Sequence, residues 1–173
     1  VNIKDQSIKI NSDTVKKTEK IGALLGALLK EDSVICLLGG LGAGKTTLTR
    51  GIGLGWRAQD RITSPTFTLV NEYSRHEDDQ KMYHLDCYRL QGSDDVETIG
   101  LEDLLDFPGP IVIEWPMVAM DWLPSDLLKI HITPFSTAAD EGRSLDFVSS
   151  GPFSNELLKK FAKQIAKWER EII

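Results

Sequence analysis

The sequence predicts an α/β fold with three layers, in which helices cover a central mixed β-sheet. An apolar run at residues 33–38 is followed by a glycine-rich stretch and then by a helical pattern, which gives the order strand, loop, helix. Further apolar runs of strand length follow, and amphipathic helical stripes lie near both ends. The chain has 173 residues, of which 41% are hydrophobic and 27% charged, so we expect residues 1–173 to form a single domain.

The N-terminal part of the chain predicts two strands and two helices. Alternating isoleucines indicate a short strand around residues 8–10, and residues 12–29 carry apolar side chains at helical spacing, with Ser12 or Asp13 as the N-cap. The buried strand at 33–38 comes next, and a helix over 45–56 leaves the glycine-rich loop.

The rest of the chain predicts five strands and a closing helix. The strands are residues 67–73, 82–88, 111–115, 127–133 and 144–149. A polar turn separates the first two, which predicts a hairpin and therefore a mixed sheet. The final segment, about 153–173, is an amphipathic helix whose apolar stripe packs on the domain or, alternatively, docks a partner.

Charge and cysteine usage limit the classes of function. With 20 basic and 26 acidic residues the formal net charge is −6, which argues against a broad phosphate-binding surface and leaves any nucleic acid to a partner. No apolar run approaches the roughly 18 residues that span a bilayer, so we expect no membrane association. Cys36 and Cys87 show no metal-ligand spacing and favour a reducing, cytoplasmic location. Because the chain begins at Val1 rather than Met, the possibility that an organellar targeting peptide was removed stays open.

The glycine-rich stretch has the pattern Gly-x-x-x-x-Gly-Lys-Ser/Thr of a phosphate-binding P-loop. Its residues are Gly39, Gly40, Leu41, Gly42, Ala43, Gly44, Lys45 and Thr46. Backbone N–H groups of such a loop cradle phosphates, and the following helix N-terminus adds partial positive charge. Lys45 is expected to bridge the β- and γ-phosphates, Thr46 to coordinate Mg²⁺ and Thr47 to reach the α-phosphate. The motif favours a P-loop NTPase-like domain over an accidental glycine turn.

Two carboxylates stand at the ends of predicted strands, where a P-loop protein holds its metal ion. Glu114 closes an aliphatic run, and a carboxylate in such a run is costly unless it is paired or metal-bound. Asp86 has a similar setting, although Arg89 nearby allows a plain surface ion pair instead. We therefore expect Thr46, Asp86 and Glu114 to hold Mg²⁺, and Lys45, Asp86 and Glu114 to carry the chemistry.

Other residues have weaker signals. Thr66 lies in a Ser/Thr-rich segment placed like a nucleotide switch, and it is either a γ-phosphate sensor or part of a plain turn. Trp115 is either a core residue or a wall of the nucleotide site, and His84 shares a strand face with Asp86 and either orients it or is core. The acidic stretch at residues 94–106 is expected to be a solvated face.

Four sequence blocks in a fixed order resemble the TsaE family, also called YjeE, small P-loop ATPases of bacterial tRNA threonylcarbamoyladenosine (t6A) synthesis. The blocks are residues 39–47 with Arg50-Gly51, residues 64–73, His84-x-Asp86-x-Tyr88-Arg89-Leu90, and Glu114-Trp115. One position departs from the family pattern: Gly40 stands where the family usually has an acidic residue. Because the cradle uses backbone N–H groups, phosphate binding should survive this change.

The resemblance implies an ATP- and Mg²⁺-dependent ATPase that works with the TsaB and TsaD proteins, which modify adenosine 37 of tRNA. The chain would support turnover without performing the transfer. Hydrolysis by the chain alone is expected to be slow, because Arg89 and Arg143 are the only evident sources of added positive charge at the phosphoryl group. Three alternatives stay open: a nucleotide-sensing adaptor without productive hydrolysis, a small-molecule P-loop kinase, and a GTP-driven switch, which the absence of an Asn-Lys-x-Asp motif disfavours.

Overall fold

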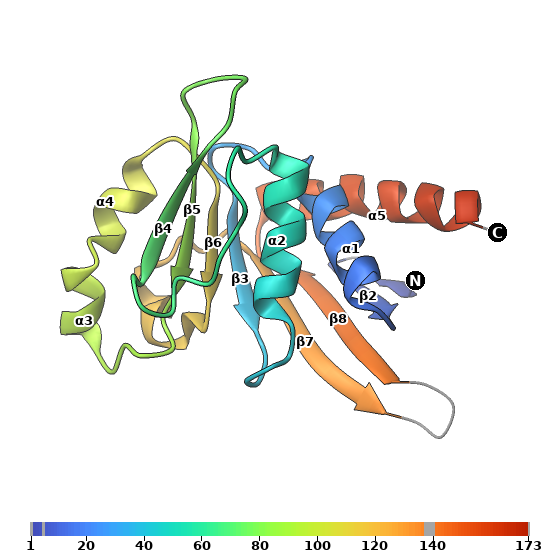
Figure 1. The fold of residues 1–173 in the computed structure, drawn as a ribbon, viewed down its shortest axis with the longest axis horizontal. Helices are drawn as coiled ribbons and strands as arrows, with labels where there is room; N and C mark the ends of the chain where they lie inside the picture. The colour runs from blue at the N-terminus through green and yellow to red at the C-terminus, as the bar shows by residue number, and fades with distance from the viewer. Residues whose placement is uncertain (1, 5, 137–140, 173) are drawn as a thin grey trace.

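The computed structural model describes residues 2–4, 6–136 and 141–172 (Figure 1). Within these residues eight strands form one sheet in the order β1-β2-β8-β7-β3-β6-β5-β4. The strands are β1 (Asn2–Lys4), β2 (Ser7–Ser12), β3 (Val34–Leu38), β4 (Val70–Ser74), β5 (Lys81–Asp86), β6 (Ile111–Glu114), β7 (Leu128–Ser136) and β8 (Glu141–Ser149). The centre of the sheet is parallel, since β3 pairs in parallel with both β6 and β7, and β6 with β5. The outer pairs are antiparallel, so the sheet is mixed, as predicted.

Helices cover both faces of the sheet and complete the predicted three layers (Figure 1). They are α1 (Val15–Gly26), α2 (Lys45–Trp56), α3 (Ser93–Thr98), α4 (Leu101–Asp106), the 3₁₀ helix η1 (Pro116–Trp122) and α5 (Pro152–Ile172). One apolar cluster joins α1, α2 and α5 to the sheet, and a second joins α3, α4 and η1 to the opposite face. Within the described residues every helix is too short or too polar to span a lipid bilayer.

The parallel centre of the sheet positions the candidate site. In a parallel sheet the carboxyl ends of neighbouring strands meet at one edge, and ligands bind in the crevice outside that edge. Here Leu37 of β3 pairs with Glu114 of β6, and Glu114 pairs with Asp86 of β5. The loop that follows β3 therefore begins beside both carboxylates.

The structure corrects the boundaries of the first predicted helix. The predicted range of 12–29 shrinks to Val15–Gly26, and the N-cap is Thr14, whose Oγ1 accepts a 3.1 Å hydrogen bond from the backbone N–H of Lys17. Ser12 belongs to β2 and hydrogen bonds through its hydroxyl to Thr18 at 2.8 Å. Ser12, one of the two predicted N-caps, is therefore the last residue of a strand instead.

Both strands of the predicted hairpin are antiparallel neighbours, but their bounds differ from prediction. Strand β4 starts at Val70 rather than residue 67, because Leu69 adopts a left-handed conformation with φ 65° and donates its N–H to the Pro65 carbonyl. Strand β5 ends at Asp86 rather than residue 88, because the Tyr88 N–H turns back to Asp86 Oδ1 at 3.0 Å. A backbone hydrogen bond before β4 and a side-chain hydrogen bond after β5 thus end the two strands where the cleft begins.

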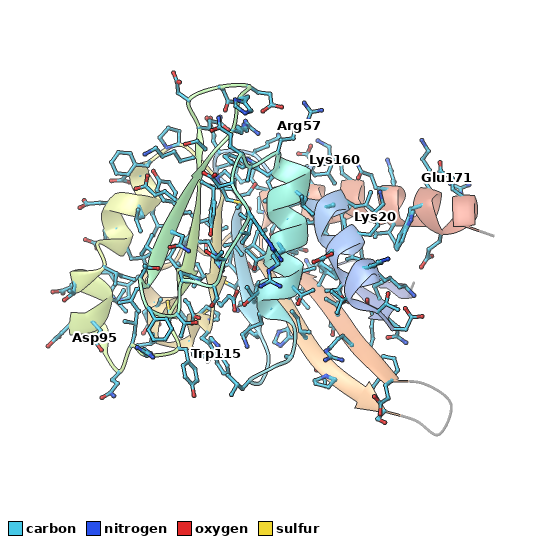
Figure 2. The ribbon with its side chains drawn as sticks, viewed as in Figure 1. Lys20, Arg57, Asp95, Trp115, Lys160 and Glu171 are labelled. Atoms are coloured by element: carbon cyan, nitrogen blue, oxygen red, sulfur yellow. The ribbon has the colours of Figure 1, made fainter. Side chains whose placement is uncertain are left out.

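The remaining elements follow the predicted order with some additions. Strand β6 ends at Glu114, one residue earlier than predicted, while β7 and β8 are longer than predicted because they pair along most of their lengths. The short elements β1, α3, α4 and η1 had no sequence prediction. The acidic stretch is exposed on α3 and α4, as expected, and Figure 2 shows Asp95 at the outside of the molecule.

Helix α5 forms as predicted, and its apolar stripe faces the core. Phe161 and Ile165 are fully buried, and the Phe161 ring lies 4.9 Å from that of Phe147 on β8. The packing alternative for this stripe is therefore the one that the structure supports.

Candidate nucleotide-binding site

The loop between β3 and α2 has a backbone that its glycines make possible. Gly39 and Gly44 have φ angles of 155° and 106°, in a region that other residues rarely adopt. A Cβ at Gly39 would lie 2.5 Å from the Ile132 carbonyl oxygen on β7. The loop can therefore pass against β7 and turn directly into the N-terminus of α2, the arrangement that a phosphate cradle needs.

Lys45, the first residue of α2, lies almost entirely inside the protein, with 5% of its surface exposed. Its Nζ donates hydrogen bonds of 2.9 Å to the carbonyl oxygens of Gly39 and Gly40 and lies 3.8 Å from the ring centroid of Trp115. Burial lowers the pKa of Lys45 below its ordinary value, while the negative charges of Glu114 and Asp86 oppose that shift. The ammonium group thus stands at the cleft with no direct carboxylate partner among the ion pairs of the described residues.

Glu114 is 3% exposed and has a hydrogen-bond partner on each carboxylate oxygen. The Thr46 hydroxyl donates to Oε2 at 3.1 Å, and Nε2 of His84 lies 3.0 Å from Oε1. These two contacts join α2, β6 and β5 around one buried carboxylate. The structure thus brings together Thr46 and Glu114, and their role in holding Mg²⁺ stays a prediction.

Asp86 is 4% exposed, and the structure does not support the surface ion pair with Arg89. Its Oδ2 accepts a 2.9 Å hydrogen bond from the Thr66 hydroxyl, and its Oδ1 accepts from the Tyr88 N–H. The Arg89 guanidinium instead lies 4.7 Å from the centre of the exposed Phe67 ring. The structure thus brings Thr66 to Asp86, and its role as a γ-phosphate sensor stays a prediction.

Trp115 adopts a left-handed backbone conformation, with φ 58° and ψ 51°, although it is not a glycine. A bulky residue in this region costs on the order of 1–3 kcal/mol, and such strain clusters at functional sites. The backbone N–H of Trp115 donates to the Leu37 carbonyl at 3.2 Å, and the indole ring lies 5.0 Å from the ring of Tyr88. Figure 2 places Trp115 at the end of the sheet where the loop after β3 lies. The indole therefore lines the site and also packs against the apolar cluster on the α3, α4 and η1 face of the sheet.

These residues surround a cleft of about 400 Å³. It is lined by Leu41, Gly42, Ala43, Gly44, Lys45, Thr46, Thr47, Arg50, Ser64, Thr66, Asp86, Tyr88, Glu114 and Trp115. Of the predicted site residues only Gly39 and Gly40 are not in this lining, and their carbonyls hold Lys45 instead. A second hollow of about 180 Å³ shares Gly42, Gly44 and Thr47 with the cleft.

Sequence reasoning missed some of the lining. Arg50, Ser64 and Tyr88 line the cleft without having been predicted there, whereas Arg143, one of the two predicted sources of positive charge, lines the second hollow beside Gly44. The helical spacing of Arg50, one turn beyond Thr46, was the signal that would have placed it on the cleft side of α2. Periodicity gave no signal for Tyr88, which appeared only in the family-like block after His84, because the turn after Asp86 depends on a side-chain hydrogen bond.

The side chains that face the cleft suit a magnesium ion. The described residues contain no cluster of three or more His, Cys, Asp or Glu side chains that would cage a metal by itself. They do bring two carboxylates, Asp86 and Glu114, and the Thr46 hydroxyl to the same cleft. Magnesium is usually held by one or two carboxylates together with substrate phosphates, so this oxygen donor set fits it. The arrangement can bind a polyphosphate with its metal and polarise a phosphoryl group.

Comparisons with known proteins place the chain in a family. Residues 12–143 match the family described as Threonylcarbamoyl adenosine biosynthesis protein TsaE. A protein from Nostoc sp. named tRNA threonylcarbamoyladenosine biosynthesis protein TsaE is 42% identical over 133 residues, which cover 75% of this chain and 80% of the relative. The protein of the same name from Bacillus subtilis is 33% identical over 146 residues, covering 84% and 88%.

A solved structure shows the same fold. The crystal structure of Bacillus subtilis YdiB matches with a TM-score of 0.74 at 28% identity, covering 92% of this chain and 96% of that one. The family match spans α1, the glycine-rich loop, both carboxylates and Trp115. From the match over residues 12–143 and the relatives that are 42% and 33% identical, the chain belongs to the TsaE family.

Proposed function

We propose that this chain is the Mg²⁺-dependent ATP-binding and ATP-hydrolysing subunit of tRNA t6A modification at adenosine 37, acting through a TsaB/TsaD complex. One observation carries the proposal: Lys45 and Thr46 of a P-loop face two buried carboxylates, Asp86 and Glu114, across one cleft. P-loop ATPases use this combination to hold a nucleoside triphosphate with its metal.

Phosphate binding is supported by the loop backbone and by Lys45. The N–H groups at the start of α2 and the partial positive charge of that helix favour an anion at the loop. Lys45 now donates to two neutral carbonyls, and the β- and γ-phosphate oxygens of ATP would be stronger, charged acceptors for the same ammonium group. The second hollow, continuous with the loop at Gly42 and Gly44, offers room for the nucleoside.

The residues that would hold Mg²⁺ are Thr46, Glu114 and Asp86. When bound, the ion supplies positive charge that neutralises the phosphoryl oxygens during transfer. In this proposal Asp86 positions the attacking water, Thr66 reports the γ-phosphate to the segment before β4, and Trp115 covers Lys45. Arg50 lines the same cleft and adds a cationic group that the chain itself provides.

The pathway and partners rest on the family. Its description and the relatives' names refer to threonylcarbamoyl adenosine biosynthesis, which supports a role beside the other Tsa proteins. The net charge of −6 supports an indirect relation to tRNA, because phosphate binding needs basic surface that a partner would supply. We propose a cytoplasmic location, in keeping with the bacterial relatives and two free, buried cysteines.

The decisive experiment measures phosphate release from Mg·ATP by the chain alone and with TsaB and TsaD added. We expect a slow rate alone, a higher rate with both partners and no rate above background for Lys45→Ala. Equal rates with and without the partners, despite a demonstrated complex, would instead favour a nucleotide-sensing adaptor. Transfer of the γ-phosphate to a metabolite rather than to water would favour a small-molecule kinase.

A further inference from the structure

His84 is the buried polar residue at the site that the proposed function leaves unused. It lies in the middle of β5, has no exposed surface and points to the same face of the sheet as Met82 and Asp86. Its register partner on β6 is Val112, so Glu114 is its diagonal neighbour two residues further along that strand. The strand register therefore sets the imidazole beside the Glu114 carboxylate.

We infer that His84 is a positioning residue that fixes the Glu114 carboxylate in its metal-binding orientation. This inference rests on the proposed function, in which Glu114 is a metal ligand. A glutamate has three rotatable side-chain bonds, and a single hydrogen bond from Thr46 to Oε2 leaves the carboxylate free to turn. The 3.0 Å contact of His84 Nε2 with Oε1 removes that freedom. It also stabilises the negative charge of a side chain that is only 3% exposed.

The contact also defines which ring nitrogen carries hydrogen. A carboxylate accepts hydrogen bonds and donates none, so Nε2 is the donor. The other nitrogen, Nδ1, is buried with no hydrogen-bond partner among the described residues. A buried Nδ1 lone pair without a partner costs less free energy than a buried Nδ1–H without a partner. Both observations therefore favour the neutral tautomer with hydrogen on Nε2.

The first test observes the imidazole itself in the metal-free protein. With ¹⁵N-labelled histidine, the expected spectrum has a protonated, pyrrole-like Nε2 and an unprotonated Nδ1 for His84. In Glu114→Gln the Nε2 signal should shift, because its acceptor changes. A ring protonated at Nδ1 alone, or a His84 signal unchanged in Glu114→Gln, would overturn the inference without touching the proposed ATPase function.

The second test compares three substitutions. Glutamine places its Nε2 the same number of bonds from Cβ as the Nε2 of histidine, whereas the asparagine nitrogen corresponds to Nδ1. His84→Gln should therefore retain Mg²⁺-dependent ATP binding close to wild type, and His84→Asn and His84→Leu should need about tenfold more Mg²⁺ for half-maximal binding. Affinity for ATP without Mg²⁺ should stay within about threefold in all three, since outer residues act through the metal ligand.

Controls separate positioning from packing. Met82→Leu changes a fully buried residue on the same face of β5 that does not contact Glu114 in any hydrogen bond, and its Mg²⁺ dependence should be that of wild type. Adding His84→Leu to Glu114→Gln should produce no further change in Mg²⁺ dependence. Equal behaviour of His84→Gln and His84→Asn would overturn the inference, even where His84→Leu fails to fold. Absence of Mg²⁺-dependent ATP binding in the wild type would overturn the proposed function instead.

Discussion

Asp86 and Glu114 are register partners on neighbouring parallel strands, and each is the last residue of its strand. The pairing sets two buried carboxylates side by side at the edge of the sheet where the P-loop begins. Among the described residues neither carboxylate pairs with a lysine or an arginine, and their hydrogen bonds come from hydroxyl, imidazole and backbone groups. Buried carboxylates of this kind are expected to recruit a metal ion, and the predictions below follow from that arrangement.

Lys45→Ala should weaken ATP binding strongly. A charge-assisted hydrogen bond contributes about 1.5–3 kcal/mol, so loss of the ammonium group should raise the Kd by roughly 10- to 150-fold. Isothermal titration calorimetry measures this directly. Lys20→Ala, which removes an exposed lysine from α1, is the control and should leave the affinity unchanged (Figure 2). Near wild-type affinity in Lys45→Ala would contradict the assignment of the loop.

Glu114→Gln should impair Mg²⁺-dependent hydrolysis more than nucleotide binding. The substitution keeps the size of the side chain but removes the charge that attracts the metal, so we expect at least a tenfold lower rate at limiting Mg²⁺. Rates measured across a Mg²⁺ titration check this, with the exposed Glu97→Gln on α3 as the control. If Glu114→Gln behaves like wild type while Asp86→Asn loses activity, Asp86 is the principal metal ligand.

Gly39→Ala and Gly40→Ala should differ sharply although the two glycines are adjacent. A Cβ at Gly39 would lie 2.5 Å from the Ile132 carbonyl oxygen, and the φ angle of 155° is unfavourable for alanine. Gly39→Ala should therefore lose roughly 1–3 kcal/mol of stability. Nothing lies within 4 Å of a Cβ at Gly40, so alanine there should change stability by less than about 0.5 kcal/mol. Urea unfolding distinguishes the two. The same open space should admit Gly40→Asp, which introduces an acidic residue of the kind usual in the family.

The two cysteines should resist alkylation until the protein unfolds. Burial raises the pKa of both Cys36 and Cys87 from 9.0 to about 12, so the folded protein holds them as unreactive thiols. Iodoacetamide labelling at pH 8, followed by mass spectrometry, should modify neither in buffer and both in urea. Rapid labelling of the folded protein would show that β3 around Cys36 or the turn after β5 around Cys87 opens.

The same shift predicts lower stability in alkali. Between about pH 9 and 12 the unfolded chain loses thiol protons that the folded chain retains, so the free energy of unfolding falls as pH rises. The fall should approach about 1.4 kcal/mol per pH unit for each thiol. Cys36→Ala should show a shallower alkaline decline than wild type in urea unfolding, and an identical decline would contradict the assignment.

Phe161→Ala on α5 should destabilise the protein by about 3–5 kcal/mol, because the side chain is fully buried against Phe147. Phe153→Ala is the matched control on the same helix, since Phe153 is 69% exposed, and it should change stability by less than about 0.5 kcal/mol. Thermal unfolding of both variants measures the difference. Equal losses would mean that α5 does not pack as the structure shows.

Much of the architecture could be predicted because it depends on local patterns. Apolar runs of strand length identified β3 and β6, helical periodicity identified α1, α2 and α5, and the spacing of fixed residues identified the P-loop. The short elements β1, α3, α4 and η1 escaped prediction because each is too short to show a period.

The sequence by itself determined the residue types of the site: a glycine loop that can turn where Cβ atoms would clash, a lysine and a threonine at the start of a helix, and two carboxylates at strand ends. Only the tertiary structure decided how they meet. Strand register paired Asp86 with Glu114 and set His84 beside Glu114, and the left-handed backbone at Trp115 accompanies the contact of its ring with Lys45. The reason is physical: local sequence sets backbone preferences, whereas contacts between distant segments depend on the packing of the whole sheet.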